Sequence, residues 1–159
     1  MASEEELVIF LSEFDYQVRL IQKIYDTIEK KKAMLDREGA VPELVESAGY
    51  WLHNLYCAFE DFFKIVSAFW ENHVPSDGEY HIQMLRRMHL EIEGIRPALI
   101  SDKSYQELND LRGFRHAFRH AYSYGLDDER VRHLLQRTVK AREIIFHDFE
   151  GFKNIIKAM

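Results

Sequence analysis

The sequence predicts an all-α protein, an antiparallel helical bundle of about five helices that forms one domain over residues 1–159. Apolar side chains recur at three- and four-residue spacing along most of the chain, which is typical of amphipathic helices. No segment alternates apolar and polar residues as a half-buried strand does. The 159 residues include seven glycines and three prolines, too few for the many turns of an all-β fold. The length fits a single domain.

The first predicted helix runs from about Ser3 to about Arg37. Its apolar side chains follow alternating spacings of four and three residues, the a/d pattern of a helix that packs along one seam. These residues are Leu7, Leu11, Phe14, Val18, Ile21, Tyr25 and Ile28. Gly39 then suits the end of this helix, and Pro42 suits the start of the next one.

The second predicted helix carries two apolar seams side by side. One seam consists of Leu44, Ala48, Trp51, Leu55, Ala58, Phe62, Ile65 and Phe69, and the other of Leu52, Tyr56, Phe59, Phe63, Val66 and Trp70. A helix with two apolar seams contacts partners on two sides. We therefore expect it to be the central helix of the bundle, or to face both the core and a second subunit. The extent of these seams predicts a two-fold dimer.

A shorter third helix is predicted from about Glu79 to about Glu93. Ser104 and Glu107 have the spacing of a capping box, so a fourth helix is expected to start near Ser104. Gly125 suits a residue of left-handed backbone after that helix. Together with a long last helix, these segments complete a bundle that is built on three long helices.

The last predicted helix begins after an aspartate cap, Asp127 or Asp128, and belongs to a basic segment of an acidic chain. The formal net charge of the chain is −6. Residues 112–142 nevertheless contain three acidic residues and eight basic ones, namely Arg112, Arg115, Arg119, Arg130, Arg132, Arg137, Lys140 and Arg142. A local basic face on an acidic protein fits a defined polyanion site, and an ordinary solvated helix face fits the charges equally well.

The single cysteine, Cys57, cannot form an internal disulfide and is interpreted as a small core residue. The N-terminus has no basic region that leads into an apolar signal core. No apolar stretch approaches the roughly 20 residues that a membrane span needs. We therefore expect a reducing, cytoplasmic setting without a membrane.

The residues that point to chemistry gather within about three turns of the fourth helix. On a helical wheel one face carries Arg112, Arg115, Arg119 and Tyr122, and a flank carries His116 and His120. Like charges at these spacings cost a few tenths of a kcal/mol per pair, roughly, so their accumulation indicates a site. Arginine can grip a phosphate through two hydrogen bonds, and a neutral histidine can transfer a proton near neutral pH. An Arg–His pair can thus cut RNA, whose 2′-hydroxyl is a built-in nucleophile, without a metal or another cofactor.

Other interpretations of the same residues stay open at this point. His116 and His120 could be a metal-binding pair at i and i+4, although the adjacent arginines repel a cation and no companion ligand motif is present. They could also be ordinary hydrogen-bonded surface histidines. Tyr122 could be a half-buried aromatic residue near the end of a helix.

Arg115, His120 and Tyr122 match the pattern R-x4-H-x-Y, and the segment resembles the active-site helix of HepT-type HEPN ribonuclease toxins. The resemblance also covers the architecture: two long N-terminal helices, a shorter third, and the motif late on a penultimate helix. One position departs from the pattern. The residue after the motif arginine is commonly Asn or Asp in this superfamily and is His116 here.

The resemblance implies a ribonuclease toxin that pairs as a homodimer, with motif helices meeting across a cleft. Arg115 would stabilise the transition state and His120 would transfer protons, while Arg112, Arg119 and His116 are expected to aid RNA binding. HepT-type toxins are silenced by a minimal nucleotidyltransferase (MNT) antitoxin, which transfers AMP onto the tyrosine that corresponds to Tyr122. The alternatives are a non-catalytic HEPN-like dimer that binds a nucleotide, RNA or protein, and a helical dimerisation protein that binds an acidic partner.

Overall fold

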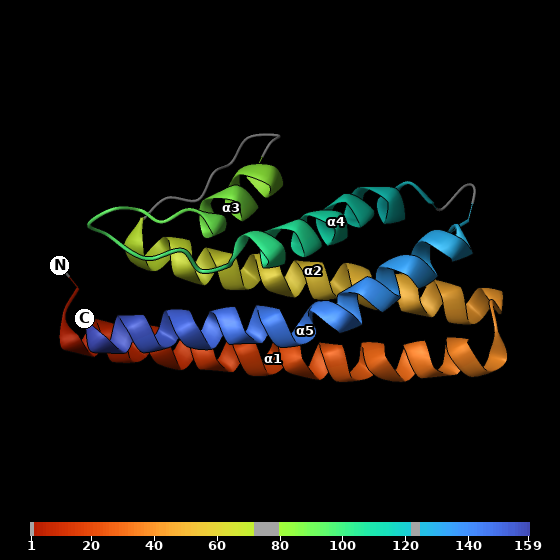
Figure 1. Ribbon diagram of the computed structural model, residues 1–159, viewed down its shortest axis with the longest axis horizontal. Helices are drawn as coiled ribbons and strands as arrows, with labels where there is room; N and C mark the ends of the chain where they lie inside the picture. The colour runs from red at the N-terminus through yellow and green to blue at the C-terminus, as the bar shows by residue number, and fades with distance from the viewer. Residues whose placement is uncertain (1, 72–79, 122–124) are drawn as a thin grey trace.

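The computed structural model describes residues 2–71, 80–121 and 125–159, and these residues form an all-α bundle as the sequence predicts. The helices are α1 (Glu4–Glu38), α2 (Pro42–Trp70), α3 (Tyr80–His89), α4 (Asp102–Arg119) and α5 (Asp128–Ala158). The long helices α1, α2 and α5 run alongside one another, and α3 and α4 cover the side of α2 that faces away from α1 (Figure 1). Among the described residues, no helix is both long enough and apolar enough to cross a membrane.

Local sequence signals account for the ends of α1 and the start of α2. Ser3 and Glu6 form a reciprocal capping box, with hydrogen bonds of 2.7 and 3.1 Å between each side chain and the other's backbone N–H. Gly39 ends α1 with a positive φ of 84°, and its N–H donates to the carbonyl oxygen of Leu35. Pro42 occupies the first turn of α2, where its missing N–H costs no helical hydrogen bond.

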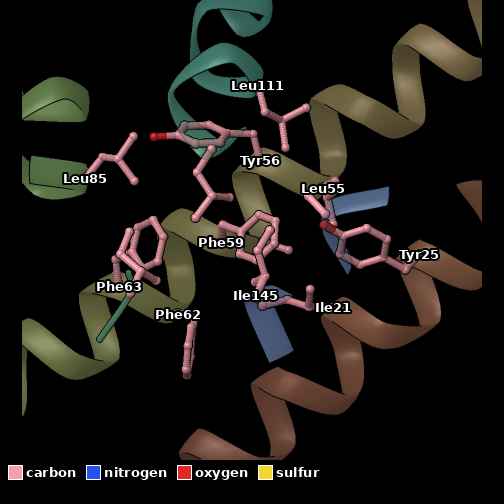
Figure 2. Close-up of a cluster of buried hydrophobic side chains, with 14 of the residues drawn as sticks. Ile21, Tyr25, Leu55, Tyr56, Phe59, Phe62, Phe63, Leu85, Leu111 and Ile145 are labelled. Atoms are coloured by element: carbon pink, nitrogen blue, oxygen red, sulfur yellow. The ribbon is translucent and has the colours of Figure 1, made fainter. Parts of the chain in front are cut away.

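Helix α2 is the central helix, and side chains from both of its predicted seams are buried. Leu55 and Phe59 point toward α1 and α5, whereas Tyr56 points toward α3 and α4 (Figure 2). All three side chains are fully buried. The chain's own helices therefore bury part of each seam, whereas Trp51, Ile65 and Phe69 of the first seam are only partly buried.

Helix α3 ends at His89, four residues before the predicted end at Glu93. The buried guanidinium of Arg96 donates to the carbonyl oxygens of Arg87 and Leu90, so it satisfies groups that a longer helix would have bonded internally. Arg96 is itself held by Glu71, which lies just after α2, at 2.7 Å. The predicted start at Glu79 lies outside the described residues.

Helix α4 begins earlier than predicted, and its N-cap is Ser101 and not Ser104. The hydroxyl of Ser101 accepts a hydrogen bond from the Ser104 N–H. Asp148 of α5 accepts from the Ser101 N–H and from both serine hydroxyls at 2.5–2.9 Å, so the Ser104 side chain is committed to it. Glu107, the expected partner of Ser104, instead forms an ion pair with Arg137 of α5.

The connection from α4 to α5 is partly as predicted. Asp127 caps α5 by accepting a hydrogen bond from the Glu129 N–H at 3.1 Å. Gly125 has the expected left-handed backbone, with φ of 76°. It does not directly end α4, because that helix stops at Arg119 and its C-cap is His120.

Candidate active site

The C-terminal half of α4 is fixed against α2 by close apolar packing. Phe114 is buried, and it approaches α2 at Gly49 together with Phe118 and Leu126. A Cβ added at Gly49 would lie 2.6 Å from a methyl carbon of Leu126, so a residue without a side chain permits this approach. This packing determines which way the charged residues of α4 face.

The motif arginine, Arg115, points inward and forms a polar cluster with residues of two other helices. Its Nη1 atom lies 3.4 Å from Oε1 of Glu60 on α2. The same atom lies 2.7 Å from Nδ1 and 2.5 Å from Nε2 of His81 on α3. His81 Nδ1 is also 2.5 Å from Oε2 of Glu60, so the three side chains contact one another. The Arg115 side chain is 15% exposed, so most of it is shielded from solvent.

A cavity of about 240 Å³ opens beside this cluster and collects most of the residues that the sequence singled out. Its lining consists of His81, Ile82, Arg112, Arg115, His116 and Arg119. The guanidinium of Arg112 is held in place by two hydrogen bonds to the side-chain oxygen of Asn109. Guanidinium groups that converge on one small cavity are suited to binding a phosphate or another compact anion.

The motif histidine, His120, lies at the end of α4 beside the cavity. It is the C-cap residue and is exposed. The ring of His120 contacts that of His116, with the centroids 4.4 Å apart. His116 lines the cavity, so His120 lies one side chain away from it. The structure thus brings Arg112, Arg115, His116 and Arg119 together and places His120 next to them. Tyr122, the expected modification site, lies outside the described residues.

Two further α2 side chains, His53 and Cys57, face the motif end of α4. The ring of His53 stacks on Phe118 at 4.9 Å, and its Nε2 lies 3.7 Å from the Cys57 sulfur. Burial lowers the pKa of His53, and the charges of Arg115 and Arg119 lower it further. Burial raises the pKa of the Cys57 thiol, against the opposing effect of Arg115. Cys57 is half-buried beside the site, whereas the sequence suggested an ordinary core position.

Glu60 and His81 are the site residues that sequence reasoning missed. Glu60 is an acidic residue next to an apolar seam, four positions after Tyr56 and three before Phe63, and it is buried. A buried carboxylate needs a polar or charged partner. An acidic residue beside an apolar seam is therefore a signal that could have identified Glu60 as a site residue. His81 offers no comparable signal, because it lies on a separate short helix.

Comparison with known proteins found a match to the part of the chain that contains this site. A family model described as HepT-like protein covers residues 47–156, more than half of the chain. The match includes Glu60, His81 and the whole α4 motif. No curated protein and no solved structure matches the chain.

Proposed function

We propose that this chain, which belongs to the HepT-like protein family, is a metal-independent endoribonuclease toxin of a toxin–antitoxin pair. The observation that carries the proposal is the cavity that Arg112, Arg115 and Arg119 line together with His116, whose ring contacts that of His120. Such a cavity can hold an RNA phosphate and offer proton-transferring groups at its edge. Family membership supports the toxin role, because the resemblance to HepT-type proteins implies it.

In the proposed reaction the RNA 2′-hydroxyl is the nucleophile. Its oxygen bonds to the adjacent phosphorus, and the bond to the 5′-oxygen of the next nucleotide breaks. Arg115 stabilises the charge that develops on the phosphate, and His120 transfers a proton. Arg112, Arg119 and His116 bind the neighbouring RNA backbone. The products are a 2′,3′-cyclic phosphate end and a 5′-hydroxyl end.

The proposal includes a two-fold homodimer in which the ends of the two α4 helices meet. Arg115 faces the inside of its own subunit, whereas His120 is exposed at the helix end. A second copy that packs on the exposed residues His116, Arg119 and His120 would join two such ends into one cleft. Light scattering at micromolar concentration tests this, and a monomer would count against the dimer.

Regulation by an antitoxin is the part of the proposal that rests most on the family. We expect a minimal nucleotidyltransferase to transfer AMP onto Tyr122, which follows His120 by two residues. The added phosphate would place negative charge near the arginines that hold RNA, and the nucleotide would obstruct the cleft. Co-expression with such a partner should add the mass of one or more AMP groups, and Tyr122→Phe should prevent the first addition. An unchanged mass with an active partner would contradict this.

A second candidate function is a non-catalytic dimer that binds a nucleotide, RNA or protein. The observation in its favour is that a buried carboxylate, Glu60, already pairs with Arg115 and reduces the positive charge available to a transition state. A binding module should lose affinity when an arginine is removed and should tolerate His120→Ala. A nuclease needs both Arg115 and His120.

The decisive experiment incubates the pure protein with total RNA in EDTA. We expect cleavage that leaves 2′,3′-cyclic phosphate ends, and a loss of about a hundredfold or more in rate for Arg115→Ala and for His120→Ala. His147→Ala is the matched control, since His147 is an exposed histidine of α5 that lines a different cavity. If both motif variants cut RNA as fast as this control, the assigned site is wrong.

A further inference from the structure

Within the proposed ribonuclease site, the least expected contact is the one between Glu60 and His81. We propose that His81 is a second proton-transferring residue of this site and that Glu60 is the residue that orients it. The inference rests on the proposed function and adds to it a catalytic group from α3, a helix outside the motif. Three observations support it: the hydrogen-bond partners of the ring, the burial of the carboxylate, and the position of His81 in the cavity wall.

The His81 ring has a carboxylate and a guanidinium as its polar partners. Glu60 Oε2 lies 2.5 Å from Nδ1 of the ring, and a carboxylate only accepts hydrogen bonds, so the proposal puts the N–H on Nδ1 and the lone pair on Nε2. Arg115 Nη1, which is a donor, approaches the same edge of the ring, at 2.7 Å from Nδ1 and 2.5 Å from Nε2. A carboxylate that holds one ring nitrogen while the other faces the reacting group is the arrangement by which enzymes fix a histidine as a base.

Glu60 and His81 differ in burial, and this difference fits an orienting role for Glu60 and a proton-transferring role for His81. The Glu60 side chain is only 6% exposed, whereas that of His81 is 36% exposed and lines the cavity. The groups around the ring come from three helices: Glu60 of α2, Tyr80 of α3, and the Arg112 and Arg115 guanidiniums of α4. A residue that merely braced Arg115 would need no access to the cavity. His81 has that access on the wall where a phosphate held by Arg115 would lie.

The proposed step assigns every proton. When RNA binds, the Arg115 N–H that donates to His81 Nε2 donates to the RNA phosphate in its place, and this frees the lone pair of Nε2. The 2′-hydroxyl gives its proton to His81 Nε2 while its oxygen bonds to phosphorus. The bond from phosphorus to the 5′-oxygen breaks, and the leaving oxygen takes a proton from the His120 imidazolium. His81 therefore ends the step protonated on both nitrogens, with Glu60 facing the added charge.

The test compares RNA cleavage by wild type, His81→Ala and the control His147→Ala, with RNA affinity measured in parallel. We expect His81→Ala to lower kcat about a hundredfold or more, the usual contribution of a general base, with little change in RNA affinity. Added imidazole should restore part of the rate, because the truncated side chain opens space in a cavity that solvent already reaches. Glu60→Gln should lower the rate without responding to imidazole.

The outcomes separate this inference from the function on which it rests. If His81→Ala cuts RNA at the wild-type rate, His81 has no catalytic role. If its rate falls together with RNA affinity and imidazole restores nothing, His81 only braces Arg115. Either result overturns the inference and leaves the ribonuclease proposal standing. Wild-type protein that leaves RNA intact under all conditions would overturn both.

Discussion

Replacing Glu60 by glutamine removes a buried negative charge and leaves the size of the side chain almost unchanged. In the native protein this carboxylate lies 2.5 Å from His81 and 3.4 Å from Arg115. Two unit charges 3.4 Å apart attract each other by about 5 kcal/mol at an effective dielectric constant of 20. The cost of removing both groups from water offsets much of that attraction. What remains should be comparable to one hydrogen bond to a charged group.

We therefore expect Glu60→Gln to lower the free energy of unfolding by about 2 kcal/mol. In a chain of this length that loss corresponds to a decrease in Tm of roughly 4–8 °C. The matched control is Asp36→Asn. Asp36 pairs with Lys32 at 2.7 Å but is 57% exposed, so its loss should cost less than about 0.5 kcal/mol.

Urea unfolding followed by circular dichroism at neutral pH measures both variants. The protein concentration must be the same throughout, because dimer formation would itself add stability. If Glu60→Gln is no less stable than Asp36→Asn, the buried contacts of Glu60 do not stabilise the fold. The inference that Glu60 holds His81 and Arg115 in place would then lose its energetic basis.

Three other predictions follow from named contacts. Burial, then the nearby arginines, lower the pKa of His53, so below about pH 6.5 the unfolded chain binds a proton that the folded chain does not. The free energy of unfolding should therefore decrease as the pH is lowered through this range. In urea titrations, His53→Gln should make this dependence on pH weaker. The raised pKa of Cys57 should make the native thiol react with iodoacetamide at pH 8 more slowly than the urea-unfolded thiol, and equal rates would contradict this. Asp148→Ala should cost about 2 kcal/mol and speed hydrogen exchange at the start of α4, whereas Glu150→Ala, at an exposed neighbour, should do neither.

The helices and their order could be predicted from local signals, because those signals act over a few residues. Apolar spacing identified α1 and α2, and the cap at Asp127 is confirmed. The errors occurred where a side chain from outside a helix bonds the groups at its end. Arg96 donates to the carbonyl oxygen of Arg87, in the last turn of α3, and to that of Leu90, just after it. Asp148 takes the serine hydroxyls at the start of α4, which displaces the predicted cap.

For the candidate site, the spacing of residues along the chain was enough to predict which of them share a face of α4, because helical geometry relates positions three and four apart. Arg112, Arg115 and Arg119 do line one cavity. The residues that lie opposite these arginines became known from the packing of the helices. Glu60 and His81 reach Arg115 from 55 and 34 positions earlier in the chain, through the packing of α2 and α3 against α4. No periodicity within one helix encodes such a meeting, since it depends on how the apolar faces of three helices fit together.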